Sequence, residues 1–144
     1  MAKYIGKTED RIQQECIIVF RQTYPQLSNL LFSVPNGGTR NVIEAQKMKQ
    51  TGLTPGVSDM LLMYDSQTYC IEMKTTVGRQ STVQLEWEQL VTAEGFPYVV
   101  LRDWQSFMAF VFSIMGDEPR TNFDMDKFLE RESKMIERRK AKKR

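Results

Sequence analysis

The amino-acid sequence predicts an α/β protein built on a mixed β-sheet flanked by helices. Helix-like and strand-like segments alternate along most of its 144 residues. Two neighbouring strand-like segments are separated by only a short turn, which requires antiparallel pairing. The second of them is separated from a third by a helix-length connection, which favours parallel pairing. A sheet that contains both kinds of pair is mixed.

The first half of the chain is expected to form two helices and a short strand. In the first helix, Ile12, Cys16 and Phe20 share one face, and Thr8 is suited to cap the N-terminus. Pro25 follows the end of this helix. The expected elements are a helix over 8–24, a strand over 29–34, a turn over 35–38, a helix over 41–50 and a loop over 54–56.

The second half supplies the two-strand unit, the crossover helix and two further helices. Gly95 is suited to stop the crossover helix, and the segment after it is rich in β-forming residues. Asp103 is suited to cap the next helix, and the last segment is charged, with sparse apolar positions. The expected elements are strands over 57–65 and 68–75, a helix over 83–94, a strand over 96–101, a helix over 104–115, a linker over 116–122 and a helix over 123–140.

The composition is that of a single globular domain, with 41% hydrophobic and 26% charged residues. No apolar run approaches the ~18–20 residues that a membrane span needs, and the start lacks the apolar core of a signal peptide. Cys16 and Cys70 are expected to be buried free thiols of a cytoplasmic protein. There is no histidine. This absence excludes histidine bases, Ser-His triads and His-ligated zinc, and it leaves carboxylates and lysines to carry any chemistry.

The charge is unevenly distributed along the chain. Residues 134–144 hold seven basic side chains and one acidic side chain, which gives this segment +6; since the whole chain carries +2, the remainder carries −4. An acidic body with a basic tail is typical of a metal site combined with an arm for a polyanion. A solvated helix end that aids solubility explains the same pattern, and the sequence favours neither explanation.

Acidic and basic residues stand at the start of one predicted strand and the end of the next. Asp59 begins the first strand, and Glu72 and Lys74 end the second. In a hairpin the two carboxylates meet at one end of the sheet, and Lys74 points to the same face as Glu72. Two carboxylates beside an ammonium are suited to hold Mg²⁺ and a phosphate, and the carbonyl of Met73 can complete the protein's share of the ligands. The pattern therefore indicates a nuclease.

A structural explanation of the same residues competes with this one. Asp59 can cap a loop, and Glu72 and Lys74 can form a surface pair on an edge strand, so the motif by itself is a weak signal. Its setting adds weight, because the uninterrupted apolar run over 60–63 is typical of a strand that is covered on both faces. A carboxylate such as Glu72 between apolar neighbours is costly to bury unless it is paired or metal-bound.

Several short motifs occur in order over about residues 8 to 103. They are Pro35-Asn36-Gly37-Gly38, Lys49…Gly52…Pro55-Gly56, Ser58-Asp59, Ile71-Glu72-Met73-Lys74 and Gln84-x-x-Trp87. Together they resemble one family, the VRR-NUC (virus-type replication-repair nuclease) family of the PD-(D/E)xK nuclease superfamily, although Ser58 stands where the superfamily has proline. The resemblance implies a restriction-endonuclease-like core over 1–116, and a linker with a basic, charged C-terminal helix is expected over 117–144.

The resemblance implies an endonuclease that depends on Mg²⁺ or Mn²⁺ and acts on DNA. It assigns metal binding to Asp59, Glu72 and the Met73 carbonyl, and it makes Lys74 catalytic together with the two carboxylates. Gln84, at the head of the helix that follows, would support the site by contacting a water or a phosphate.

The family also places a carboxylate on the first helix, for which this chain offers Glu9 and Glu15. On a helical wheel of about 100° per residue, Glu9 falls inside the apolar face and Glu15 falls on its edge. A carboxylate on an apolar helix face is unusual, which favours a functional role for Glu9. The family's spacing, with Glu three residues before Ile-Gln, also fits Glu9 and Ile12-Gln13. We therefore expect Glu9 to be catalytic and metal-binding, although a favourable first-turn acid has the same position.

Six residues are candidates for DNA contacts. Gly37 and Gly38 would let the backbone approach a phosphate, and Arg40 offers a guanidinium, although a plain turn with a solvated arginine has the same composition. The complete set is Asn36, Gly37, Gly38, Arg40, Lys49 and Arg79. Trp87 is expected to belong to the core, with Leu90 and Val91 extending its face, and not to stack on bases.

The compact length resembles the stand-alone phage and bacterial members of the family, which look like resolvases that cut four-way junctions as homodimers. We therefore expect an endonuclease for branched DNA, acting as a homodimer in the cytoplasm of a bacterial cell or a phage-infected host. The alternatives are a flap, nick-repair or restriction-like nuclease, a DNA-binding module without cleavage, and a phage structural or packaging accessory protein. The sequence contains no evident base-reading element, so DNA shape is expected to matter more than DNA sequence.

Overall fold

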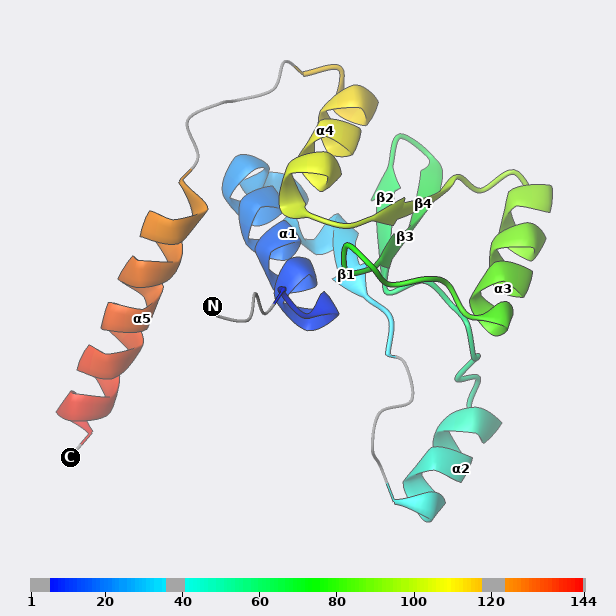
Figure 1. Ribbon diagram of the computed structural model, residues 1–144, viewed down its shortest axis with the longest axis horizontal. Helices are drawn as coiled ribbons and strands as arrows, with labels where there is room; N and C mark the ends of the chain where they lie inside the picture. The colour runs from blue at the N-terminus through cyan, green and yellow to red at the C-terminus, as the bar shows by residue number, and fades with distance from the viewer. Residues whose placement is uncertain (1–5, 36–40, 118–123, 144) are drawn as a thin grey trace.

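The computed structural model describes residues 6–35, 41–117 and 124–143, and the candidates Asn36, Gly37, Gly38 and Arg40 lie outside the described residues. A four-stranded mixed sheet flanked by helices confirms the predicted fold class (Figure 1). In chain order the elements are α1 (Glu9–Thr23), the 3₁₀ helix η1 (Pro25–Leu30), β1 (Leu31–Ser33), α2 (Val42–Gln50), β2 (Met60–Tyr64), β3 (Gln67–Met73), α3 (Thr82–Ala93), β4 (Tyr98–Leu101), α4 (Trp104–Met115) and α5 (Met125–Lys142).

Local sequence signals set most of these boundaries. The side chains of Thr8 and Asp103 accept hydrogen bonds from the backbone N–H groups three residues further on, and they cap α1 and α4 as expected. The strand expected over 29–34 is shorter than predicted, because Pro25 opens the 3₁₀ helix and this helix continues through residues 29 and 30. Proline presets the backbone angle that such a turn needs at its first position.

The sheet has the order β1-β2-β3-β4. β2 and β3 pair antiparallel, as the short connection predicted, and their two-residue turn consists of Asp65 and Ser66, both with positive φ. β3 and β4 pair parallel across the crossover through α3, with Glu72 opposite Val100. β1 pairs antiparallel with β2 on the outer side. The ends of β2 and β3 that carry the acidic residues are therefore adjacent.

The hydrophobic core lies between one face of the sheet and the helices α1 and α4, which pack against each other (Figure 1). The apolar face predicted for the first helix points into this core. Cys16 and Cys70 are buried free thiols, and burial is the main cause that raises the pKa of each. The main core residues are Ile12, Cys16, Val19, Phe20, Leu31, Met60, Leu62, Ile71, Met73, Phe107 and Val111.

The opposite face of the sheet is covered less completely, which contradicts the prediction that both faces of β2 are covered. Met60 and Leu62 are fully buried, whereas Leu61 is partly buried and Met63 is 44% exposed. The physical reason is that α3 contacts this face over β4, where Trp87 lies with its ring 6.1 Å from that of Tyr98. β2 lies two strands away from that contact.

The helices α2 and α5 extend away from the sheet (Figure 1). α2 has no buried residue, and Val42 and Ile43 at its start are 78% and 79% exposed. α5 has one buried residue, Met125, and Leu129 also packs against the core. Among the described residues, no helix is both long and apolar enough to cross a membrane.

Candidate active site

Three carboxylates from separate parts of the chain converge at one end of the sheet. Glu9 comes from the first turn of α1, Asp59 directly precedes β2, and Glu72 lies near the end of β3. One oxygen from each lies within 4.8 Å of the others. The structure therefore brings together the three carboxylates that the sequence analysis selected as metal ligands.

Asp59 is fixed by main-chain hydrogen bonds on both sides. Its Oδ2 accepts a hydrogen bond of 2.7 Å from the N–H of Met73 at the end of β3. Its own carbonyl accepts one of 2.8 Å from the N–H of Val34, just after β1. The preceding Ser58, which stands at the superfamily's proline position, is buried, and its hydroxyl donates to the Met60 carbonyl at 3.1 Å. The serine therefore leaves the approach to β2 intact.

Glu72 is 1% exposed, and its two carboxylate oxygens have different surroundings. Oε1 accepts a hydrogen bond of 3.0 Å from Nε2 of Gln84 and lies 3.6 Å from Nζ of Lys74. Oε2 is buried and accepts no hydrogen bond from the described residues. Burial, followed by the neighbouring carboxylate of Asp59, raises the pKa of Glu72 from 4.5 to about 8, against the opposing effect of Lys74.

Lys74 places an ammonium beside the carboxylates. Its side chain is 9% exposed, and Nζ lies 3.4 Å from Oε1 of Glu9 and 3.6 Å from Oε1 of Glu72. A cation at this position offsets part of the repulsion among the carboxylates. It also leaves a positive group next to the place where a bound phosphate would meet them.

Gln84 is held in place by the start of α3. Its Oε1 accepts a hydrogen bond of 2.8 Å from the N–H of Ser81, while the Ser81 hydroxyl accepts one from the N–H of Gln84. This reciprocal capping box fixes the side chain and directs Nε2 at Glu72. Gln84 therefore orients Glu72, a contact that the resemblance did not specify.

The donor set fits Mg²⁺ or Mn²⁺. All three ligand atoms are carboxylate oxygens, which hard divalent cations prefer. Oε2 of Glu72 is buried without a hydrogen-bond partner among the described residues, and such an atom is costly unless a cation or water contacts it. Met73 lies beside Asp59 through its N–H, and the assignment of its carbonyl as a ligand stays a prediction.

Of the two candidate acids on the first helix, Glu9 lies in the acidic site, but the expectation that it is the buried one is wrong. Glu9, which was expected on the buried face, has a side chain that is 48% exposed, because it is the first residue of α1 and the core contacts of this helix begin at Ile12. Glu15 is the buried acid, at 1% exposure, and it pairs with Lys7 at 2.9 Å and with Arg11 at 3.3 Å. Glu15 thus forms a separate ion cluster, and Glu9 is the helix carboxylate that lies in the acidic site.

The remaining described candidates, Lys49, Arg79 and Trp87, lie outside the cluster of three carboxylates. Lys49 is exposed on α2 and lines a cavity of about 440 Å³ together with Gln84. Arg79 is exposed in the loop between β3 and α3. Trp87 is half-buried outside the core cluster, and Leu90 is 63% exposed, so the expectation of a core position for this face is wrong. The helix α3 contacts the sheet mainly over its edge strand β4 and has no buried residue, so neither side chain is covered by the core.

Sequence analysis missed Arg102, which shapes the loop after Lys74. Its Nη1 donates hydrogen bonds of 2.6 Å to the Thr75 carbonyl and 2.8 Å to the Gly78 carbonyl. These acceptors lie 27 and 24 residues earlier in the chain. A side chain that binds distant main-chain carbonyls leaves no local sequence pattern, so no signal in the sequence identifies it.

Comparison with known proteins found a likeness in fold to a solved structure. No family model and no curated protein matches the sequence. Among solved structures, a protein named VRR_NUC domain protein is similar to this chain, with a TM-score of 0.63 and 20% sequence identity. The match covers 76% of this chain and 89% of that chain. The chain therefore has the restriction-endonuclease-like α/β fold of a VRR_NUC domain protein.

Proposed function

We propose that the chain is a divalent-metal-dependent endonuclease that hydrolyses phosphodiester bonds in DNA. The observation that carries this proposal is the convergence of Glu9, Asp59 and Glu72 within 4.8 Å, beside the ammonium of Lys74. The likeness in fold to a VRR_NUC domain protein supports it. Lys49 and Arg79 are proposed to contact phosphates, because both are exposed cations near the start of α3. Lys49 lines a cavity together with Gln84, and Arg79 lies in the loop that leads into α3.

Each residue of the site has a proposed role. Glu9, Asp59, Glu72 and the Met73 carbonyl would hold Mg²⁺ or Mn²⁺. Such an ion, when bound, stabilises negative charge on the phosphate and makes water a better nucleophile near neutral pH. Lys74 binds the phosphate or helps to take a proton from the attacking water. The amide of Gln84 restricts Glu72 to one orientation.

The proposal is tested by the cleavage of labelled DNA in Mg²⁺, in Mn²⁺ and in EDTA. We expect cleavage in both metals and none in EDTA. The variants Asp59→Asn, Glu72→Gln and Lys74→Ala should lose at least about 100-fold of the activity, the scale of removing a group that acts on the transition state. Full activity in a folded Asp59→Asn or Glu72→Gln variant would contradict the proposal.

The first turn of α1 offers a matched pair of variants. Glu9 contributes an oxygen to the cluster, whereas its neighbour Asp10 does not. Both acids are exposed and both precede the rest of the helix, so Glu9→Gln and Asp10→Asn remove the same charge from the same turn. We expect Glu9→Gln alone to raise the metal concentration needed for half-maximal cleavage. Equal effects would show that Glu9 acts through the charge of the helix terminus and not as a ligand.

We further propose that the substrate is branched DNA, such as a four-way junction, and that a homodimer cuts it. A dimer would supply two active sites for paired cuts on opposite strands. Purified protein should be compared on junction, flap and linear duplex, and its mass should be measured in solution. Paired cuts on the junction support the proposal. Preferred cleavage of flaps or nicked duplex would indicate a general repair nuclease, and binding without cleavage would indicate a DNA-binding module.

A further inference from the structure

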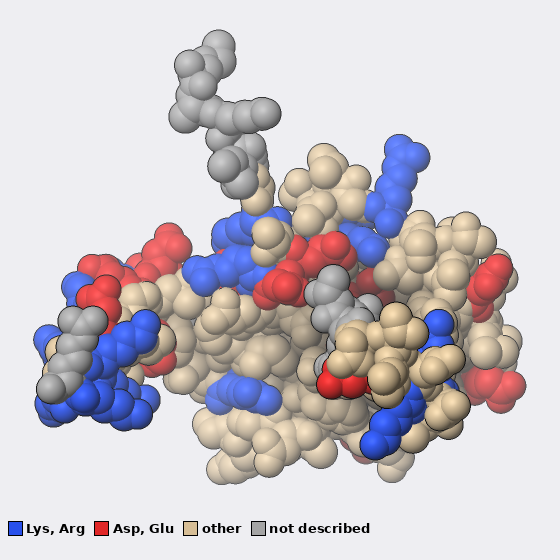
Figure 2. Space-filling view, turned by 90° about the horizontal axis from the view of Figure 1, so that it is seen from below, with Lys and Arg blue, Asp and Glu red and all other residues tan. Residues whose placement is uncertain are grey.

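Five basic side chains form one stripe along α5. They are spaced by four, three, four and four residues, so they lie within roughly 80° of one another around the helix. All five are exposed, and Figure 2 shows the basic side chains crowded on this helix. The stripe consists of Lys127, Arg131, Lys134, Arg138 and Lys142. It begins before the basic tail that composition alone marks out.

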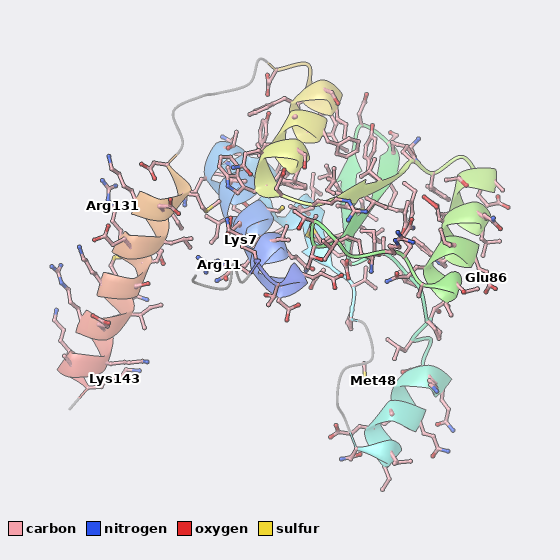
Figure 3. The ribbon with its side chains drawn as sticks, viewed as in Figure 1. Lys7, Arg11, Met48, Glu86, Arg131 and Lys143 are labelled. Carbon is pink, nitrogen blue, oxygen red and sulfur yellow. The ribbon has the colours of Figure 1, made fainter. Side chains whose placement is uncertain are left out.

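The packing of α5 decides which way the stripe faces. Met125 is buried, and Leu129 packs against the core, so these two residues mark the inner side of the helix. The stripe is centred roughly 160° away from them around the helix axis. Figure 3 shows Arg131 on the side of α5 that points away from the rest of the protein. The stripe is therefore the outer face of α5.

Most of the stripe carries positive charge that is not neutralised within the described residues. Lys134 pairs with Glu130 at 2.8 Å, and Lys127 lies 3.9 Å from Asp124. Arg131, Arg138 and Lys142 form no salt bridge with any residue that the structure describes. The acids Asp126, Glu130 and Glu137 lie on a different face, roughly 100–140° around the helix from Met125. The outer face of α5 is therefore basic, whereas its other faces carry acidic and basic side chains together.

We propose that the outer stripe of α5 binds the phosphodiester backbone of DNA. The inference rests on the proposed function for the identity of the polyanion. The five cations extend over about 22 Å, a length that spans several phosphates, and unpaired arginines bind phosphate oxygens with two hydrogen bonds. Because the stripe points away from the body, it serves as an arm that holds DNA outside the active site and takes no part in the chemistry.

A membrane surface fits this helix less well. A helix that lies on a lipid bilayer inserts an apolar face that carries its cations at the margins of that face. In α5 the apolar residues Met125 and Leu129 are directed at the protein's own core, on the side opposite the stripe. On the outer face five cations stand beside one exposed apolar side chain, Met135 at the margin of the stripe, so this face is mainly charged, as a polyanion backbone requires.

The stripe is tested with two matched triple variants of the full chain. The first, Arg131→Ala, Arg138→Ala and Lys142→Ala, removes the three unpaired stripe cations. The second, Arg139→Ala, Lys140→Ala and Lys143→Ala, removes three exposed cations outside the stripe: two on other faces of the helix and Lys143 at its C-cap. Both variants remove three charges and keep helix-forming residues. Binding of a fluorescent four-way junction and of linear duplex is measured in EDTA at a series of KCl concentrations.

Because each phosphate contact adds about 0.9 to the slope of log Kd against log salt, the stripe variant should lower this slope by about 3. The control variant should lower it by less than about 1. Equal losses in the two variants would overturn the inference, since they would show that net charge matters and the face does not. Retained DNA binding with loss of binding to phosphatidylserine vesicles would overturn it in favour of a membrane.

The test separates this inference from the proposed function. Cleavage of the same DNA is measured independently in Mg²⁺ with the wild-type chain. If the wild-type chain cuts no DNA but the stripe variant alone loses affinity, the proposed nuclease activity fails and the arm stands. If the wild-type chain cuts DNA and the two triple variants bind alike, the arm fails and the nuclease activity stands.

Discussion

Among single residues, Glu72 is under the strongest constraint in the site. Its carboxyl group is buried beside Asp59, and one of its oxygens has no hydrogen-bond partner among the described residues. The raised pKa, about 8 in the folded chain against 4.5, means that the folded state holds a proton that the unfolded state releases. The stability associated with this group is fully present below about pH 4.5 and is lost as the pH rises towards 8.

We predict that the metal-free protein becomes less stable between pH 5 and pH 8. Each unit of pKa difference corresponds to about 1.4 kcal/mol, so the loss is on the order of a few kcal/mol. Glu72→Gln, which resembles the protonated carboxyl group, should flatten this dependence. The measurement is urea unfolding in EDTA across the pH range. Glu86→Gln, the same change at an exposed position on α3, is the control and should keep the wild-type slope.

Among the elements, the contact between α3 and the loop before β2 matters most for the site. Gly56 in this loop has a φ of +83°, and a Cβ on it would lie 2.4 Å from the carbonyl oxygen of Val83 in the first turn of α3. Glycine is therefore needed there both for the backbone angle and for the close approach. The same turn holds Gln84 against Glu72, so this contact couples the loop that carries Asp59 to the support of Glu72.

We predict that Gly56→Ala weakens both folding and cleavage. Gly52→Ala is a matched control, because Gly52 also has a positive φ, +108°, but a Cβ there would meet no atom within 4 Å. Both variants should lose about 1 kcal/mol from the strained backbone, and Gly56→Ala should lose a further 1–3 kcal/mol, roughly the cost of overpacking. Urea unfolding measures the difference. Equal losses in the two variants would show that the approach to Val83 relaxes freely.

For the molecule as a whole, α5 divides into an anchored beginning and an extended end. Met125 is 5% exposed, and Leu129 packs against the core formed by the sheet, α1 and α4. Met135 and Ile136, two to three turns further on, are 44% and 50% exposed. The expected boundary between a nuclease core over 1–116 and a separate C-terminal segment over 117–144 stays a prediction. The packing of Met125 indicates that the C-terminal segment contributes to the core.

We predict that two C-terminal truncations differ in their effect on stability. Residues 134–143 are all exposed, so removal of 134–144 should leave the midpoint of urea unfolding nearly unchanged, while it weakens DNA binding and its salt dependence. Removal of 118–144 also deletes Met125 and Leu129. It should cost roughly 2–4 kcal/mol, on the scale of 1.5–3 kcal/mol for one fully buried apolar side chain. An equal midpoint for both truncations would show that the start of α5 does not stabilise the core.

Much of the fold could be predicted from the sequence because it depends on local or short-range causes. Caps at Thr8 and Asp103 set helix ends, and the lengths of the connections set the antiparallel and parallel pairs. These pairs in turn require Asp59 and Glu72 to meet at one end of the sheet, so the convergence of the two carboxylates follows from the order of the elements.

Other features were decided by the tertiary structure, because burial depends on which elements pack together. Glu15 and not Glu9 is the buried acid of α1, since the core contacts of this helix begin at Ile12 and Glu9 precedes them. Met63 is exposed because α3 reaches β4 and leaves β2 open. The cations of α5 form a stripe whose outward direction is fixed by Met125. A sequence pattern shows which residues share a face, but the contacts of that face with the rest of the chain determine whether it is covered.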